Sequence, residues 1–262
     1  MLPVHDHAAA GPVALIPAMW AVAALVAAVY LAAVRSNRHR GRWPLRRTGA
    51  CLAGVLVVAV AGQLVLSDAG AGFVGHMAAH LLVGMLAPLL LVLAAPGTLA
   101  LRSLSVVPAR RLSAVLRSGP VRLLTHPVPA ALLDVGGLWL LYASPAYGAM
   151  HASPVLLVAV HLHVFAAGYL FTFSIAGPDP APHRPSYATR GAVLIAAIAA
   201  HAVLAKYLYA HAPAGVSAAD AAAGSQLMYY GGDAIELALA VALGAAWYRS
   251  TRPRPRARPV AV

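Results

Sequence analysis

The sequence GFVGHMAAHLLVGMLAPLLLVLAA, residues 72–95, runs for 24 residues without an Asp, Glu, Lys or Arg. An α-helix needs about 20 apolar residues to cross the hydrocarbon core of a bilayer, so this stretch predicts a transmembrane helix. Two histidines, His76 and His80, lie inside it. A histidine within a membrane span is costly and usually faces the interior of a helix bundle. The segment therefore predicts both a membrane fold and a polar site inside it.

Six further stretches are long and apolar enough to span a membrane, at 13–34, 49–68, 127–147, 154–176, 191–211 and 226–248. The composition agrees, because 61% of the 262 residues are apolar and only 10% are charged, against about 25% charged in soluble domains. We therefore expect an all-α, polytopic bundle of seven transmembrane helices, forming one membrane domain over residues 1–248. The tail at 249–262, rich in arginine and proline, is predicted to be disordered.

The arginines predict the orientation of this bundle. All 18 fall in four segments that share one side of the seven-span arrangement, at 35–47, 102–122, 184–190 and 249–258. By the positive-inside rule this side is cytoplasmic, so we expect the N-terminus outside and the C-terminus in the cytoplasm. The net charge of +12 is then a topogenic signal in contact with the lipid bilayer, and nucleic acid is not an expected partner.

Ionisable side chains inside membrane spans mark the first place to look for function. Here they are His76, His80, Asp134, His161, His163, His201, Lys206, Asp233 and Glu236. At a rise of about 1.5 Å per residue, the histidines and carboxylates of the third, fifth, sixth and seventh spans lie roughly 6–15 Å below the outer boundary. Four helices are thus predicted to share one polar layer in the outer half of the membrane. Asp134 is predicted to lie outside this layer, nearer the cytoplasmic end of its span.

The spacing of these residues limits which side chains can reach one common site. The two histidines of the third span are four residues apart, which places both on one face of the helix. His161 and His163 are two residues apart, or about 200° around a regular helix, so only one of them can reach the same site. Asp233 and Glu236 share a face, where they can bind a metal directly or accept hydrogen bonds from histidine ligands.

Imidazoles that converge from several helices suit zinc or copper. Met77, Met85 and Met228 lie in or near the same layer, and their thioethers would favour Cu(I). Each methionine is more often a packing residue than a ligand, and each histidine can instead form a hydrogen bond between helices. Lys206 is expected to be a counter-ion to the seventh-span carboxylates or to extend to the membrane surface.

These residues resemble those of a known family. The string GHMAAHLLVGMLAPLLLVLAAPG is similar to the third-span signature of the CtaG family of cytochrome oxidase assembly proteins. The similarity continues through THP at 125–127, VHLHVFAAGYLF at 160–171, GPDPAPHRP at 177–185, AH at 200–201 and YYGGDAIEL at 229–237. The order and spacing of these motifs within seven spans carry the resemblance.

The resemblance implies a multi-pass protein of the bacterial plasma membrane that assists the assembly of a haem–copper cytochrome c oxidase. No hydrolytic or redox machinery is visible in the sequence, so we do not expect an enzyme. The resemblance also implies copper as the metal, the oxidase catalytic subunit as the recipient, and an extracytoplasmic copper chaperone as a further partner. The family's membrane histidines correspond to His76, His80, His161 and His201, to which we add His163, Met77, Asp233 and Glu236 as secondary candidate ligands.

Three other functions would use the same residues. A metal or proton transporter needs ionisable groups that continue to the cytoplasmic face, where the sequence offers only Asp134 and His126. A haem-binding electron carrier would use histidines on facing helices as axial ligands. A structural assembly scaffold would bind nothing at these histidines.

Overall fold

The computed structural model describes residues 12–67 and 72–252, and these residues form helices with no strand among them. In chain order the elements are η1 (Pro12–Leu15), α1 (Ile16–Ser36), η2 (Arg38–Arg40), α2 (Leu45–Leu66), α3 (Gly72–His80), η4 (Leu81–Leu86), α4 (Ala87–Leu93), α5 (Pro96–Ser103), α6 (Val106–Leu116), α7 (Gly119–Leu124), α8 (Pro127–Ala131), η5 (Leu132–Gly136), α9 (Gly137–Tyr142), α10 (Ala146–Ala152), α11 (Pro154–Ala176), α12 (Tyr187–Ala210) and α13 (Ala218–Thr251).

Six helices are long and apolar enough to cross a membrane, and they correspond to the predicted spans except the fourth. The predicted span at 127–147 is a bent pair, because Pro127–Tyr142 and Ala146–Ala152 meet at 81°. Pro145 lies in the break and lacks the N–H that a continuous helix would need there. The chain is therefore a multi-pass helical membrane protein with six spans, or seven if the bent pair counts as one.

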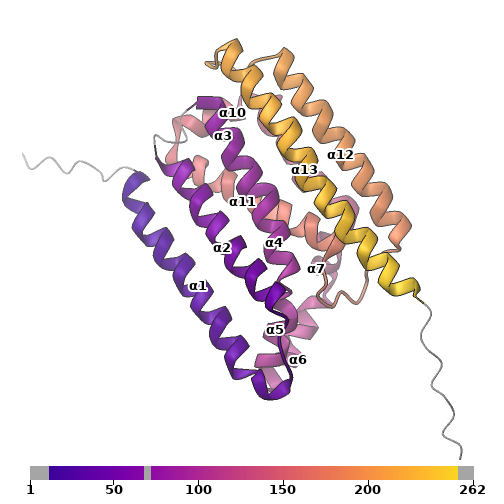
Figure 1. Ribbon diagram of the computed structural model, residues 1–262. Coiled ribbons are helices and arrows are strands. Elements are labelled where there is room, and N and C mark those ends of the chain that lie inside the picture. Colours follow the sequence, from indigo (N-terminus) through magenta and orange to yellow (C-terminus); the bar gives the residue numbers. More distant parts are fainter. Residues whose placement is uncertain (1–11, 68–71, 253–262) are drawn as a thin grey trace, which may run out of the picture.

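The third span lies at the centre of the bundle and α1 lies at its edge (Figure 1). In the most apolar window of the third span 61% of residues are buried, against 6% in α1. The third span packs against α2, α11 and α13, whereas α1 packs mainly on α2. Helix α3 is the first part of this central span, so its histidines are surrounded by other helices.

Both π-helices interrupt spans that line the interior. Residues 81–86 form η4 directly after His80, and residues 132–136 form η5 within the bent pair. A π-helical turn accommodates an extra residue and leaves part of the regular hydrogen-bond ladder open. Such turns are frequent at functional sites.

The last span begins earlier than predicted, at Ala218 rather than at residue 226. The Ser217 hydroxyl oxygen caps its first turn by accepting the Asp220 N–H at 3.2 Å. Asp220 in turn accepts the Phe73 N–H at 2.6 Å and the Val74 N–H at 3.3 Å. The extra turns of α13 therefore hold the N-terminus of α3, since a carboxylate is stabilising beside the unpaired N–H groups of a helix start.

The arginine-bearing segments gather at one end of the bundle, toward the lower right in Figure 1. We call this the arginine end and the opposite one the histidine end. Arg40 and Arg102 each donate to the other's backbone carbonyl oxygen at 2.6 Å, which joins the α1–α2 connection to α5. The assignment of this end to the cytoplasm stays a prediction. Most of the predicted disordered tail, 253–262, lies outside the described residues.

Asp179 fastens the loop between α11 and α12 to the start of α5. Its carboxylate accepts the Gly97 N–H at 2.9 Å, the Thr98 N–H at 2.6 Å and the Thr98 hydroxyl at 2.5 Å. Asp179 is only 7% exposed. Removing a buried acceptor leaves its donors without partners, which costs about 1–3 kcal/mol.

We therefore expect Asp179→Ala to lower the free energy of unfolding by about 1–3 kcal/mol. Asp179→Asn, which keeps one acceptor oxygen, should lose less. Denaturation of the purified variants in one detergent measures both effects. Equal stability of the alanine variant and the wild type would show that these hydrogen bonds do not hold the loop.

Candidate functional site

Helix α3 carries the two histidines on its buried face. His76 is 8% exposed and His80 is 3% exposed. They lie one helical turn apart, as their spacing predicts. Each meets a different histidine from another helix, and these two pairs form separate parts of the site.

The first pair joins α3 to α11 near the histidine end. The ring centres of His76 and His161 are 5.6 Å apart, and those of His76 and His151 are 5.8 Å apart. Tyr142 fixes His76 through a contact of 2.8 Å between its hydroxyl and Nε2. The structure therefore gathers three imidazoles here. His151 belongs to α10, where it lies beside Tyr147. It was not among the candidate ligands predicted from the sequence.

The hydrogen bonds of His161 and His151 suit metal ligands. Nδ1 of His161 lies 2.8 Å from the Leu157 carbonyl oxygen, and Nδ1 of His151 lies 2.9 Å from that of Tyr147. A carbonyl oxygen only accepts, so each Nδ1 carries the proton and each Nε2 keeps its electron pair. Ligand histidines in metalloproteins are commonly oriented in this way.

An open cavity of about 580 Å³ adjoins this first pair. His76, His151 and His161 line it together with Tyr147 and Asp220. It opens at the histidine end, where α3 and α13 begin. The cavity thus gives the three imidazoles access from outside the bundle.

The second pair lies deeper, between α3, α12 and α13. The ring centres of His80 and His201 are 6.0 Å apart. Nδ1 of His201 lies 3.3 Å from Oε1 of Glu236, and both residues are buried, at 2% and 7% exposure. Both ring nitrogens of His80, Nε2 of His201 and Oε2 of Glu236 have no hydrogen-bond partner among the described residues.

A small cavity of about 30 Å³ lies at this second pair. His80, His201 and Glu236 line it, and so does Asp134 from η5. The sequence prediction placed Asp134 outside the histidine layer, and that is wrong because Asp134 lines the same cavity as His80, His201 and Glu236. No residue pattern marks the π-helical turn that contains Asp134.

The remaining candidates lie away from both pairs. Nε2 of His163 donates to the Leu133 carbonyl oxygen at 3.1 Å, so His163 joins α11 to η5 and His161 is the one that reaches His76. Met77 is fully buried in an apolar cluster with Phe73 and Met228, and Asp233 lines neither cavity.

Lys206 is exposed, and its Nζ lies 5.3 Å from the ring centre of Tyr229. It therefore stacks on an aromatic ring, which attracts a cation through the negative face of its π system. The expected ion pair with Asp233 or Glu236 is not formed among the described residues.

The geometry fits pairs of metal ligands rather than one complete cluster. Within residues 12–67 and 72–252, no three His, Cys, Asp or Glu side chains are gathered closely enough to hold a metal ion. Two imidazoles that share a metal about 2.0 Å from each nitrogen have ring centres roughly 5–6.5 Å apart. The separations of 5.6 Å and 6.0 Å both meet this condition.

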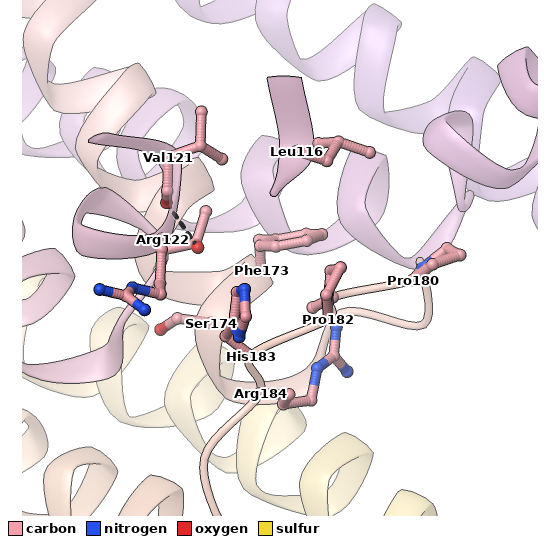
Figure 2. A pocket seen from close by; sticks show the side chains of 11 residues that line it. Leu116, Val121, Arg122, Phe173, Ser174, Pro180, Pro182, His183 and Arg184 are labelled. Atoms are coloured by element: carbon pink, nitrogen blue, oxygen red, sulfur yellow. Dashed lines mark hydrogen bonds between the residues drawn. The ribbon is translucent and has the colours of Figure 1, made fainter. Parts of the chain in front are cut away.

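A further small pocket lies at the arginine end and is lined by basic side chains (Figure 2). Its volume is about 20 Å³, and Phe173, Arg122, His183 and Arg184 line it. Arg184 donates to the carbonyl oxygens of Gly177 and Asp179, and burial followed by the nearby Arg190 charge lowers its pKa. Because that guanidinium holds the loop, the pocket is part of the fold rather than a ligand site.

Comparison with known proteins finds short matches to curated relatives. An uncharacterized protein of Mycobacterium leprae is 30% identical over 88 residues, which cover 34% of this chain and 13% of the relative. Uncharacterized proteins of Mycobacterium bovis and Mycobacterium tuberculosis are each 33% identical over 88 residues, with the same coverage. The matched part is thus a small fraction of the length of these relatives. No solved structure matches the chain.

The family comparison covers most of the chain. The profile described as cytochrome c oxidase caa3 assembly factor (Caa3_CtaG) matches residues 28–250. This range includes α2 to α12 and all but the end of α13, with both histidine pairs. The chain therefore belongs to the Caa3_CtaG family of cytochrome c oxidase assembly factors.

Proposed function

We propose that this assembly factor binds copper at the histidines of α3, α11 and α12 and transfers it to the catalytic subunit of a haem–copper oxidase in the bacterial plasma membrane. The observation that carries the proposal is the presence of buried imidazole nitrogens without hydrogen-bond partners on His80 and His201. An unpaired buried polar group costs about 1–3 kcal/mol, which a bound ligand would offset.

The choice of copper rests on the donors together with the family. Imidazole nitrogen binds copper and zinc well, and the family assembles cytochrome c oxidase. A site for transfer must also release its metal. Pairs of histidines with replaceable further ligands suit release better than a closed cage of four.

A transporter is less well supported than an assembly factor. Such a protein needs a polar route across the membrane. The second cavity is lined toward the arginine end by Leu89 of α4 and Leu239 of α13. A polar route that starts at the histidine end would therefore meet apolar side chains on the arginine-end side of Glu236.

The proposal is tested by the copper content of the purified wild type beside a His76→Ala/His80→Ala double variant. We expect the variant to lose its bound copper, since each pair loses one imidazole, and cells that contain it to lose oxidase activity. His183→Ala is the matched control, because His183 is an exposed histidine at the opposite end. A His76→Gln/His80→Gln variant repeats the test with side chains closer in volume.

Two results would contradict the proposal. Equal copper in the wild type and both double variants would exclude the histidines as ligands. Double variants without copper that still support full oxidase activity would separate the metal site from assembly. Retention of the elution profile in size-exclusion chromatography shows that the variants are folded.

A further inference from the structure

We propose that the histidine layer holds two separate copper sites, one open and one enclosed, and that copper passes from the first to the second along α3. The open site is formed by the pair His76 and His161, with His151 beside it, and the enclosed site by the pair His80 and His201, with Glu236 and Asp134 beside it. This inference rests on the proposed copper-binding function and specifies how the metal moves.

The two sites are separate in space. His76 packs against His151 and His161, whereas His80 packs against His201. No residue lines both the open cavity and the small cavity. The two pairs therefore line two different cavities.

The enclosed site has the features of a ligand-binding position. Four of its buried polar atoms lack partners among the described residues, on His80, His201 and Glu236. Its cavity of about 30 Å³ is close to the volume of one water molecule, so it can hold one small ligand. With Nδ1 of His201 directed at Glu236, Nε2 of that ring keeps its electron pair for a metal.

Charge distinguishes the enclosed site from the open one. A cation buried in a membrane protein needs nearby negative charge, because its desolvation is costly. Glu236 and Asp134 bring carboxyl groups to the enclosed site. The open cavity also has a carboxylate, that of Asp220, but its oxygens already accept the Phe73 and Val74 N–H groups at the start of α3. We therefore expect copper to bind first where access is open and more tightly where the carboxyl groups lie.

The helix geometry sets a short path between the sites. His76 and His80 are one turn apart, which is about 6 Å along the axis of α3. A copper ion that exchanges the His76 imidazole for that of His80 moves by about this distance without crossing a second helix. The oxidation state of copper stays the same in this ligand exchange, and the freed imidazole is available to the next ion.

The inference is tested by the stoichiometry of Cu(I) binding to the full chain in detergent. Purified protein competes under reducing conditions with bicinchoninate, a coloured Cu(I) chelator. We expect two equivalents for the wild type and for His183→Ala. The open-site variant, His151→Ala/His161→Ala, should retain one tighter equivalent, and the enclosed-site variant, His201→Gln/Glu236→Gln, one weaker equivalent.

The outcomes separate this inference from the proposed function. One equivalent in the wild type that both variants lose would overturn the two sites and leave copper binding in place. No bound copper in the wild type would overturn both. His80→Gln alone, a smaller change, should also retain one equivalent, and its complete loss of copper in a folded protein would contradict the separation.

Discussion

Gly168→Ala is expected to cause the largest loss of stability of any small substitution in this chain. A Cβ at residue 168 of α11 would lie 2.9 Å from the carbonyl carbon of Gly84 and still closer to its oxygen. Both atoms belong to the backbone of η4, so no flexible side chain can move aside. Overpacking costs about 1–3 kcal/mol where side chains can adjust, and we expect this variant to reach or exceed the upper value.

The measurement is thermal and denaturant unfolding of the purified protein, with the yield of monodisperse protein as a second readout. Gly191→Ala is the matched control, because a Cβ at residue 191 of α12 meets no atom within 4 Å. It should be as stable as the wild type. If both variants unfold together with the wild type, the close crossing of α11 and η4 is not required for the fold.

Gly232→Ala is expected to have the largest effect on the enclosed site without removing a ligand. The added Cβ would lie 3.0 Å from Nδ1 of His201 and even closer to its Cε1. The ring must then shift from the position in which Nδ1 meets Glu236. Loss of such orienting contacts typically lowers metal affinity about 10–100-fold, and we expect a decrease of this size for the tighter Cu(I) equivalent.

Competition with the same chelator measures this affinity. Gly244→Ala is the control from the same helix, because its Cβ meets no atom within 4 Å. The control should bind Cu(I) as the wild type does. Unchanged affinity in a folded Gly232→Ala protein would show that the position of the His201 ring does not matter for copper.

Much of the fold follows from hydropathy alone, since a run of apolar residues without charges has few alternatives to a membrane helix. The break in the fourth span was missed, although Ser144 and Pro145 mark it in the sequence. The early start of α13 was also missed. Residues 218–225 are less apolar than the span itself, and their role in holding α3 through Asp220 depends on a partner far away in the sequence.

The candidate site was only partly predictable for a related reason. Spacing shows that His76 and His80 share a face, because both belong to one regular helix. It cannot show which of His161 and His163 faces α3, since that depends on the rotation of α11. His151 and Asp134 reach the site through the bent fourth span, whose path is set by tertiary packing and a π-helical turn.

The π-helical turn after His80 has a consequence for comparing sequences. Because η4 accommodates one more residue than a regular helix over the same path, a homologue with an uninterrupted third span would have one residue fewer between its second histidine and its proline. An alignment would place a gap between residues 81 and 86. Deleting one residue there should convert the turn to α-helix and keep the direction of the histidines relative to Pro88, whereas the same deletion in a regular helix would rotate them by about 100°.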